Sequence, residues 1–309
     1  MSFDFVPEIV QQNPWLFGGI AATTIVGLYL IRVYRKWIAG GVCTSKARLD
    51  GKTVIITGAN SGIGLEAAVD VAKRNARVIL ACRSVERGKA AVTDVKKRSG
   101  NNNVAFVQLD LGSLNSVRAF AAKILEDEPR IDILINNAGV MMLPKRILTS
   151  DGFEMQFGVN HLGHFLLTNL LLDRIKETPR ARIVILSSAA QGFAEKLDFD
   201  NLNCERNYSV TGSYFASKLE NVLFTQSLAK RLEGTGVTTN AVDPGAINTG
   251  LQRHLHFPLV SLHGANDYCY VLLLILNLFL LCRIYLYLYG VHLVARLHCK
   301  EPRLPSTVQ

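Results

Sequence analysis

The sequence lacks paired cysteines: its six cysteines form no CxxC motif, and no Cys/His spacing is typical of a zinc site. We therefore expect unpaired thiols in a reducing compartment and no bound metal. The chain also lacks internal repeats and any Pro-rich or Ser-rich linker.

No long run of Lys or Arg occurs, although 34 such residues against 25 Asp and Glu give a net charge of +9. This spread of positive charge argues against nucleic acid and favours a membrane surface or a phosphate-bearing cofactor.

The N-terminal region contains one charge-free apolar run. The residues from Trp15 to Ile31 are apolar or small throughout, and about 17–25 residues suffice to span a bilayer. Basic residues follow at once, from Arg32 to Lys36, which places the succeeding domain on the cytoplasmic side. We predict a membrane anchor with a basic flank over residues 1–36. The alternatives are a buried helix and a cleaved signal peptide, although a signal peptide carries positive charge before its apolar run and acids stand there here.

The C-terminal segment, residues 252–309, carries a second apolar run. It extends from Tyr268 to Tyr289 and is interrupted by Asn277 and Arg283. Its length permits a second membrane span, but the basic residues after it would then lie on the far side, against the positive-inside tendency. A segment that lies in the membrane interface, or is folded onto the main domain, is an equal alternative.

The region between these ends alternates strand-like and helix-like patterns. The chain has 309 residues and is 49% hydrophobic, enough for one large α/β domain, which we place at residues 37–251. The strand candidates are short and rich in Val, Ile or Leu, as in strands buried on both faces. This alternation predicts a doubly wound parallel sheet of the Rossmann type. The candidate strands are Thr53–Thr57, Arg77–Cys82, Val104–Leu109, Ile131–Ile135, Arg182–Leu186 and Thr238–Val242, and the candidate helices include Gly64–Arg74, Leu114–Leu125 and Gly163–Ile175.

The first candidate strand ends in a glycine-rich turn that leads into a helix. Glycines let the backbone turn tightly and approach a pyrophosphate, and the helix N-terminus offers free N–H groups and the positive end of its dipole. The strand before the turn and the helix after it make this signal far more specific than glycines alone. Contacts with a dinucleotide are expected from Thr57, Gly58, Asn60, Ser61, Gly62, Ile63 and Gly64.

The second candidate strand ends at Cys82, Arg83 and Ser84 without an acidic residue. A site for NAD usually places Asp or Glu near this point to hold the ribose 2′-hydroxyl. The guanidinium of Arg83 is instead suited to a 2′-phosphate, which favours NADP. A solvated surface arginine is the alternative.

Polar residues also end the third and fourth candidate strands. Asp110, followed by Leu111, is placed to accept a hydrogen bond from the adenine amino group, with an N-cap of the next helix as the alternative. In the fourth turn, Ala138 and Gly139 are small enough for the cofactor ribose to lie against the backbone. Asn137 either joins that contact or only satisfies neighbouring main-chain groups.

Tyr214 and Lys218 stand four residues apart at the start of an apolar-periodic helix that runs to about Leu232. This spacing puts both side chains on one helix face. The pKa of a phenol is about 10, too high for a base at neutral pH. A neighbouring ammonium favours the phenolate and so lowers this pKa. We expect Lys218, together with an oxidised nicotinamide, to lower the pKa of Tyr214 so that it can act as an acid or base. An ordinary half-exposed helix face is the alternative.

Two further residues are candidates for the catalytic site. Ser188 ends the fifth candidate strand, where its hydroxyl can bond a substrate oxygen, and a turn or capping serine is the alternative. Asn160 lies in a helical stretch although Asn is a poor helix former, which suggests a role such as holding water beside Lys218. His161 and His164 lie nearby without acidic or Cys partners, so we expect no metal there.

Together these motifs resemble the short-chain dehydrogenase/reductase family, in its order and at its spacings. The resemblance covers about Gly40 to Leu251. It narrows to membrane-anchored, NADP-preferring retinol dehydrogenases on three stretches: Ala81–Ser84, Asp132–Met141 and Asp151–Asp173. The motifs are Thr57-Gly-x-x-x-Gly-x-Gly64, Asn136-Asn-Ala-Gly139, Ser188, Tyr214-x-x-x-Lys218 and Pro244-Gly245.

The resemblance implies a role for each catalytic candidate. Tyr214 is expected to be the general acid or base, and Lys218 to bind the nicotinamide ribose and tune Tyr214. Ser188 is expected to position the substrate, and Asn160 to complete a tetrad. The hydride chemistry itself belongs to the cofactor, while the protein supplies the geometry.

The resemblance also implies contacts at both ends of the cofactor. Asp110 is expected at the adenine, and Thr249, which follows Pro244 and Gly245, near the carboxamide. The expected activity is NADP-dependent hydride transfer between retinol and retinaldehyde, or between a similar apolar alcohol and carbonyl such as a steroid or a lipid aldehyde. We expect the endoplasmic reticulum membrane with the catalytic domain in the cytosol, with a mitochondrial membrane as the alternative.

The sequence departs from the family after Leu251. In the family, the residues after Thr249 build a segment that covers the substrate, a further helix and an edge strand. Here an apolar segment takes their place. A protein that binds the cofactor without turnover is therefore the alternative to an active enzyme.

Overall fold

The structure is a computed structural model, and it describes residues 25–30, 32–33, 43–194, 196–245, 247 and 251. The described residues fall into two units, one with residues 25–30, 32–33 and 43–45, and one with residues 46–194, 196–245, 247 and 251. In the first unit, residues 25–30 and 32–33 are helical. Among the residues described, no helix is both long enough and apolar enough to cross a membrane. Most of the predicted anchor and the whole apolar run from Tyr268 to Tyr289 lie outside the described residues.

The second unit is built on a parallel six-stranded sheet with the order β3-β2-β1-β4-β5-β6. From β1 at the centre the chain steps outward to β3, returns to β4 and steps outward again to β6. This order confirms the predicted doubly wound sheet of the Rossmann type. The strands are β1 (Thr53–Thr57), β2 (Arg77–Cys82), β3 (Val104–Gln108), β4 (Ile133–Asn136), β5 (Arg182–Leu186) and β6 (Thr238–Val242).

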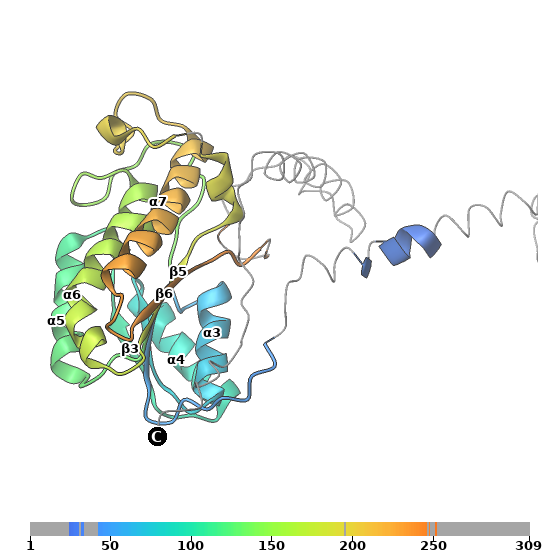
Figure 1. The fold of residues 1–309 in the computed structure, drawn as a ribbon, viewed down its shortest axis with the longest axis vertical. Helices are drawn as coiled ribbons and strands as arrows, with labels where there is room; N and C mark the ends of the chain where they lie inside the picture. Colours follow the sequence, from blue (N-terminus) through green and yellow to red (C-terminus); the bar gives the residue numbers. More distant parts are fainter. Residues whose placement is uncertain are drawn as a thin grey trace, which may run out of the picture. The chain divides into compact units, whose positions relative to one another are not determined.

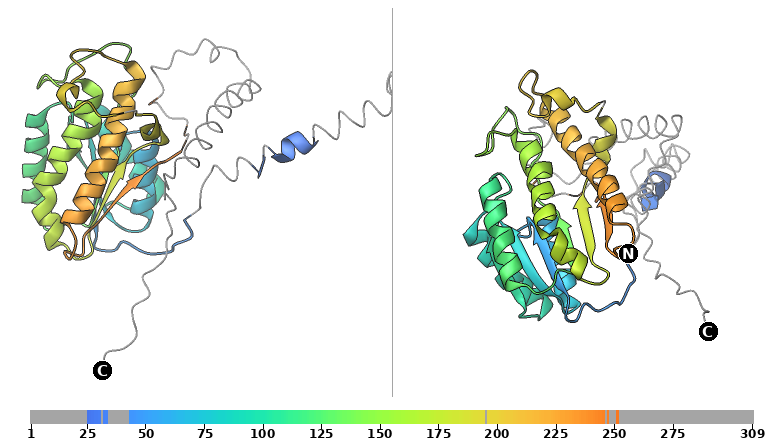
Figure 2. Two further views of the ribbon diagram at one scale, coloured as in Figure 1. Left: turned by 45° about the horizontal axis from the view of Figure 1, so that its top comes forward. Right: turned by 60° about the vertical axis from the view of Figure 1, so that its left-hand side comes forward.

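Helices cover both faces of this sheet (Figure 1). One face carries α5 (Leu114–Asp127), α6 (Gly163–Glu177) and α7 (Val210–Arg231), and the other carries α3 (Gly62–Lys73) and α4 (Val85–Ser99). The two further views show the same layers, with α5, α6 and α7 side by side (Figure 2). Short helical turns complete the elements: the π-helix η1 (Phe157–Leu162) and the 3-10 turns η2 (Ala189–Phe193) and η3 (Phe199–Asn201).

The alternation of side chains along β1 divides the core between the two layers. Val54 and Ile56 pack with apolar residues of α3 and α4, whereas Ile55 packs with residues of α5, α6 and α7. Each of these three side chains is 0% exposed. Because successive residues of a strand point to opposite faces, a sheet covered on both sides requires an apolar residue at every such position.

Most of the predicted strands have the bounds that the structure gives them. The third ends at Gln108 rather than Leu109, and the fourth is Ile133–Asn136 rather than Ile131–Ile135. Ile131 is fully buried, but its N–H donates to Thr178 Oγ1 at 3.2 Å instead of to a neighbouring strand. Apolar burial alone therefore placed this strand too early.

The helix bounds differ slightly from the predicted ones as well. The first helix begins at Gly62 rather than Gly64, because the glycine-rich turn passes directly into its first turn. The helix that carries Tyr214 begins at Val210, where the Ser209 hydroxyl accepts a hydrogen bond from Gly212 N–H at 3.0 Å. This N-cap fixes the start of the helix.

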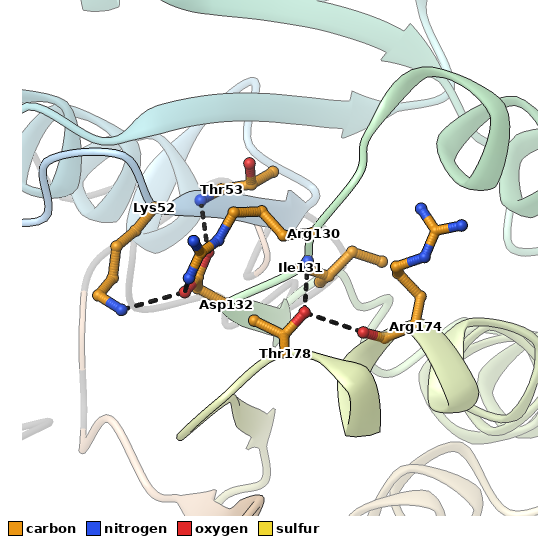
Figure 3. Close-up of polar contacts among 7 residues, drawn as sticks. All are labelled: Lys52, Thr53, Arg130, Ile131, Asp132, Arg174 and Thr178. Atoms are coloured by element: carbon orange, nitrogen blue, oxygen red, sulfur yellow. Dashed lines mark hydrogen bonds and ion pairs between the residues drawn. The ribbon is translucent and has the colours of Figure 1, made fainter.

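Asp132 fixes the edge of the sheet at which β1 and β4 begin (Figure 3). Its carboxylate accepts hydrogen bonds from Thr53 N–H at 2.9 Å, from Lys52 Nζ at 3.1 Å and from Arg130 Nη2 at 2.7 Å. Burial opposes the charged form of this carboxyl, but the hydrogen bonds outweigh it and hold the pKa of Asp132 below its usual range. One carboxylate thus ties the starts of the two central strands together.

We predict that Asp132→Asn lowers the free energy of unfolding by about 1–3 kcal/mol, because charge-assisted bonds to a buried group are lost. Since the pKa is depressed in the folded state, this stability is present above the unfolded pKa of about 3.9 and is lost as pH falls through the folded value. Urea unfolding of the full chain in detergent, followed by circular dichroism, measures the difference. Asp127→Asn removes the exposed Lys123–Asp127 pair and should leave the midpoint unchanged; equal shifts in both variants would contradict the prediction.

Candidate active site

A cleft of about 420 Å³ lies at the carboxyl ends of the strands, the edge at which doubly wound sheets bind ligands. It is lined by residues that end or follow every strand from β1 to β6. Most of the predicted site residues meet there. They are Gly58, Asn60, Ser61, Gly62, Ile63, Arg83, Asp110, Leu111, Asn137, Ala138, Gly139, Ser188, Tyr214, Lys218, Pro244 and Gly245.

Four predicted residues do not line the cleft in this structure. Thr57, Gly64 and Asn160 are buried behind its wall. Their contacts with lining residues are described below. Thr249 lies outside the described residues, so its contact with a carboxamide stays a prediction.

The glycine-rich turn packs directly against the turn after β4. Gly58 has φ +66° and Gly62 has φ +56°, a backbone region that glycine adopts readily. A Cβ on Gly58 would lie 2.8 Å from Ala138 Cα, and one on Gly64 would lie 2.5 Å from Asn137 Nδ2. Helix α3 begins at this turn without a side-chain hydrogen bond at its N-cap. The turn therefore combines close backbone packing with a helix N-terminus at the cleft, the arrangement that suits a phosphate group.

Two arginines lie at the cleft where β2 leads into α4. Arg83 and Arg87 both line it, and both are exposed. The Ser84 hydroxyl caps α4 by accepting from Arg87 N–H at 3.3 Å. Sequence reasoning found Arg83 and missed Arg87, although its position four residues on, in the first turn of a helix, was the signal available.

Asp110 is not the N-cap of α5, which corrects the alternative considered for it. That role belongs to Ser113, whose hydroxyl accepts from Ser116 N–H at 3.3 Å. Asp110 Oδ1 instead accepts from Gly112 N–H at 2.9 Å, and the residue lines the cleft. The carboxylate is thus fixed locally at the mouth of the site.

The Asn137 side chain does satisfy a main-chain group, as its alternative reading proposed. Its Nδ2 donates to Thr57 O at 2.7 Å, and its N–H donates to Thr57 Oγ1 at 2.9 Å. Ala138 N–H also donates to Thr57 Oγ1, at 3.0 Å. The ends of β1 and β4 are therefore bonded to each other through side chains beyond the last ladder pair.

Tyr214 and Lys218 lie on one buried face of α7, each 5% exposed, and both line the cleft. Lys218 Nζ lies 5.6 Å from the centroid of the Tyr214 ring and donates to Leu186 O at 3.2 Å. The Lys218 main-chain carbonyl accepts from Ser187 Oγ at 2.8 Å. These contacts tie α7 to the end of β5 and remove the alternative of a half-exposed helix face.

The surroundings of Tyr214 in the protein without a cofactor favour its neutral form, and a lowering of its pKa by Lys218 together with an oxidised nicotinamide stays a prediction. Burial raises the pKa of this phenol, the Ser188 side chain opposes the shift, and the charge of Asp243 adds to it. Burial likewise lowers the pKa of Lys218 to about 8. In the protein without a cofactor the tyrosine is thus held as the neutral phenol, because burial disfavours the phenolate anion.

Ser188 is a capping serine, as its alternative proposed, and its contact with a substrate oxygen stays a prediction. Its Oγ accepts from Ala190 N–H at 3.2 Å as the N-cap of η2, and its side chain also bonds Tyr214. Capping fixes the hydroxyl in place, and it is close enough to Tyr214 to oppose the rise in the pKa of the phenol. A capping serine can therefore also be a site residue.

Asn160 lies within η1, where the chain makes a π-turn before α6. Its side chain is fully used: Oδ1 accepts from Val140 N–H at 2.8 Å, and Nδ2 donates to Val140 O at 2.9 Å and Ser217 Oγ at 3.0 Å. Its main-chain carbonyl accepts from Asn221 Nδ2 at 3.1 Å. The residue joins the turn after β4 to α7, beside Gly139 and Lys218.

The two histidines near Asn160 bond to protein groups. His161 Nδ1 lies 3.1 Å from Asn221 Oδ1, and His164 lies between Thr57 Oγ1 and Asn160 O. Burial lowers the pKa of both, that of His164 to about 4. Within the described part of the chain, no cluster of three or more His, Cys, Asp or Glu side chains is arranged to hold a metal ion.

The cleft also has an apolar wall that the sequence did not indicate. Val140, Met141 and Met142, in the turn after β4, line it together with Met155. Val140, Met141 and Met142 directly follow the small residues of that turn, whereas Met155 precedes η1 and no spacing in the sequence brings it to the other three. They provide a surface for an apolar ligand.

The residues present fit a dinucleotide. The glycine-rich turn leaves no room for a Cβ at Gly58 or Gly64, α3 begins at the cleft, and Arg83 and Arg87 offer cationic donors beside it. Tyr214 and Lys218 lie on α7, at the other wall of the same cleft. Phosphate groups and a reacting end would thus have separate places.

The sequence pattern of the short chain dehydrogenase family matches residues 52–257 of this chain. The chain belongs to the short-chain dehydrogenase/reductase family. Members of this family are oxidoreductases that bind a nicotinamide cofactor, and this member acts on CH–OH groups. Its sheet order and the cleft at the strand ends are those that such a cofactor requires.

Curated relatives of this short-chain dehydrogenase are retinol dehydrogenases. Human retinol dehydrogenase 13 is 51% identical over 247 residues, which is 80% of this chain and 72% of the relative. Human retinol dehydrogenase 11 is 51% identical over 72% of this chain and 70% of its own length, and human retinol dehydrogenase 12 is 50% identical over 76% and 74%.

Solved structures show the same fold. The crystal structure of an uncharacterised protein from Mycobacterium Paratuberculosis has 40% sequence identity and a TM-score of 0.59, covering 70% of this chain and 76% of the other. A short-chain dehydrogenase from Sphingobium yanoikuyae in complex with NADPH has 28% identity and a TM-score of 0.56, covering 69% and 78%.

We predict that Gly64→Ala disrupts the cofactor site. The new Cβ would lie 2.5 Å from Asn137 Nδ2 and 2.6 Å from Gly58 O, so both turns must shift, at a cost of about 1–3 kcal/mol in stability. Titration of cofactor fluorescence should show weaker binding, and the thermal unfolding midpoint should fall. Gly192→Ala, at a glycine with no atom within 4 Å of the added Cβ, should change neither. Normal cofactor binding by Gly64→Ala would refute the packing argument.

Proposed function

We propose that this short-chain dehydrogenase is an NADP(H)-dependent oxidoreductase that interconverts retinol and retinaldehyde, or a similar apolar alcohol and carbonyl. The observation that carries the proposal is the convergence of Tyr214, Lys218 and Ser188 on one cleft that also holds Arg83 and an apolar wall. The chain is 50–51% identical in sequence to three human retinol dehydrogenases over most of its length, which supports the substrate class.

The arginines support NADP(H) as the cofactor. A guanidinium pairs with phosphate through planar, charge-assisted hydrogen bonds, whereas NAD sites present a carboxylate to the ribose. Arg83 and Arg87 line the cleft after β2. The acidic residue among the lining residues, Asp110, follows β3 instead. Asp110 and Leu111 would contact the adenine, and Pro244, Gly245 and Thr249 the nicotinamide end.

A bound nicotinamide supplies or accepts the hydride. Tyr214 is held as a neutral phenol by burial, so in the reducing direction it can donate its proton to the substrate oxygen. Lys218, with a pKa of about 8, is mainly charged at neutral pH and can hold the ribose beside Tyr214. Ser188, fixed by its N-cap bond, positions the substrate oxygen, and Asn160 holds the turn after β4 against α7.

The apolar wall supports a lipid-soluble substrate without choosing among such substrates. Val140, Met141 and Met142 offer dispersion contacts to an apolar substrate. They carry no polar side chain that could distinguish substrates by the positions of their hydroxyl groups. A steroid or a lipid aldehyde is therefore the second candidate. The chain after Leu251, which replaces the family's substrate-covering segment, makes a cofactor-binding protein without turnover the third.

We further propose that residues 1–36 anchor residues 37–251 to a membrane, with residues 252–309 as an atypical apolar segment. The support is the charge-free run from Trp15 to Ile31 and the basic flank after it. The endoplasmic reticulum with a cytosolic catalytic domain is the preferred location, and a mitochondrial membrane is the alternative. A tethered site would meet a lipid-soluble substrate at high local concentration.

We expect membranes that contain the full chain to reduce all-trans-retinaldehyde with NADPH, and Tyr214→Phe to lower this activity at least about a hundredfold through loss of the general acid. NADPH binding should persist in the variant, because only a hydroxyl is removed.

The activity should remain in the membrane pellet after an alkaline carbonate wash. Its release into the supernatant would contradict the anchor.

If neither wild type nor Tyr214→Phe reduces retinaldehyde while both still bind NADPH, the retinoid substrate is refuted. Activity on a steroid or lipid aldehyde would then select the second candidate. No turnover on any apolar carbonyl would select the third.

We predict that Arg83→Gln raises the Kd for NADPH about tenfold and leaves the Kd for NADH nearly unchanged, since a charge-assisted bond to phosphate is lost. Fluorescence titration with both cofactors measures the ratio. Lys89→Gln, an exposed change on α4 outside the cleft lining, is the matched control for loss of a positive charge. A parallel loss of affinity for NADPH and NADH in Arg83→Gln would argue against the 2′-phosphate contact.

A further inference from the structure

We propose that His164 is a positioning residue: a neutral imidazole that carries its proton on Nδ1 and links the Thr57 hydroxyl to the Asn160 carbonyl, which holds the cofactor turn and α7 in register. The proposal rests on the proposed function, because the two walls that it joins are those assigned to the cofactor and to proton transfer.

The two ring nitrogens of His164 contact two different elements, the end of β1 and the helical turn η1. The residue lies in the first turn of α6 and is 2% exposed. Its Nε2 lies 2.8 Å from Thr57 Oγ1, at the end of β1, and its Nδ1 lies 3.0 Å from Asn160 O, in η1. Both ring nitrogens therefore face an oxygen at hydrogen-bond distance.

The hydrogen bonds at Thr57 determine the state of Nε2. Thr57 Oγ1 accepts from Asn137 N–H at 2.9 Å and from Ala138 N–H at 3.0 Å, which uses both lone pairs of a hydroxyl oxygen. The hydroxyl hydrogen must then be donated. His164 Nε2 at 2.8 Å is a much closer acceptor than Ile135 O at 3.4 Å. Nε2 is therefore the unprotonated nitrogen.

The opposite nitrogen confirms this tautomer independently. A neutral ring without a proton on Nε2 carries it on Nδ1, which donates to Asn160 O at 3.0 Å. The other tautomer would set a bare Nδ1 against a carbonyl oxygen and give Thr57 Oγ1 a third donor. Burial lowers the pKa of His164 to about 4, so the ring remains neutral near physiological pH.

The link continues from Asn160 to Lys218. Asn160 O also accepts from Asn221 Nδ2 at 3.1 Å, and the same Nδ2 donates to Leu186 O at 3.2 Å. Leu186 O in turn accepts from Lys218 Nζ at 3.2 Å. His164 is thus the step that connects the bonds around Thr57 to the bonds around Lys218.

Two conservative variants separate the two bonds. In His164→Gln the amide oxygen can take the place of Nε2 and keep the Thr57 bond, while the bond to Asn160 is lost. In His164→Asn the amide nitrogen can take the place of Nδ1 and keep the Asn160 bond, while the bond to Thr57 is lost. We expect the Gln variant to lower kcat about tenfold with the NADPH Kd unchanged, and the Asn variant to raise the Kd about tenfold with kcat at saturating cofactor retained.

Ile175→Ala is the matched control. It lies on the same helix, is 0% exposed, and removes buried volume without contacting Thr57 or Asn160. It should lower the unfolding midpoint and leave kcat and Kd unchanged below that temperature. The positioning role is refuted if both His164 variants shift kcat and Kd in parallel, or if they only lower the unfolding midpoint and leave kcat and Kd unchanged, as Ile175→Ala does.

The tautomer is tested without turnover. In full-length protein labelled with ¹⁵N-histidine in detergent, His164 should give the chemical shifts of an Nδ1–H ring and should not titrate between about pH 6 and about pH 8. A ring protonated on Nε2 would overturn the proposal. Because this spectrum and the NADPH Kd need no substrate, they decide the role of His164 even if the wild type reduces no retinaldehyde and the proposed function fails.

Discussion

The burial of β1 between two helical layers is the constraint from which the rest of the structure follows. With Val54, Ile55 and Ile56 fully covered, polar groups can lie only at the ends of the strand. At one end Asp132 binds Thr53 N–H and fixes where β1 and β4 begin. At the other end Thr57 accepts from both residues that follow Asn136, so the two strands also finish together. Structural polar groups and site polar groups are thereby separated by the thickness of an apolar core.

Much of this arrangement could be predicted from the sequence. Short runs of Val, Ile and Leu gave the central strands, because a strand covered on both faces must be apolar throughout. The cofactor turn, Arg83, Asp110, Ser188 and the pair Tyr214 and Lys218 could be placed at one cleft, since parallel strands bring their carboxyl ends to the same edge. The predicted start of β4 was wrong, because Ile131 is buried like a strand residue but its N–H donates to Thr178 Oγ1.

Other features depend on partners that are distant in the sequence. The sequence marks Asn160 as a poor helix former, but its contacts with Val140 and Ser217, within the π-turn, join residues 20 and 57 positions apart. His164 was considered only as a metal ligand, and its partner Thr57 belongs to the first strand. The raised pKa of Tyr214 reflects its burial against β5 and η2, which the spacing of Tyr214 and Lys218 does not report. Local pattern thus identifies the reactive groups, whereas tertiary packing sets their protonation.

The contact between the cofactor turn and the turn after β4 has a consequence for how this domain can be altered. A Cβ on Gly58 would meet Ala138, and one on Gly64 would meet Asn137, so each pair of positions shares a single volume. Neither turn can be exchanged by itself for the equivalent turn of a relative with larger residues. A chimaera that joins the first half of this sheet to the second half of another must carry matched residues on both sides of the junction, and the two halves of the Rossmann fold are therefore not independent modules here.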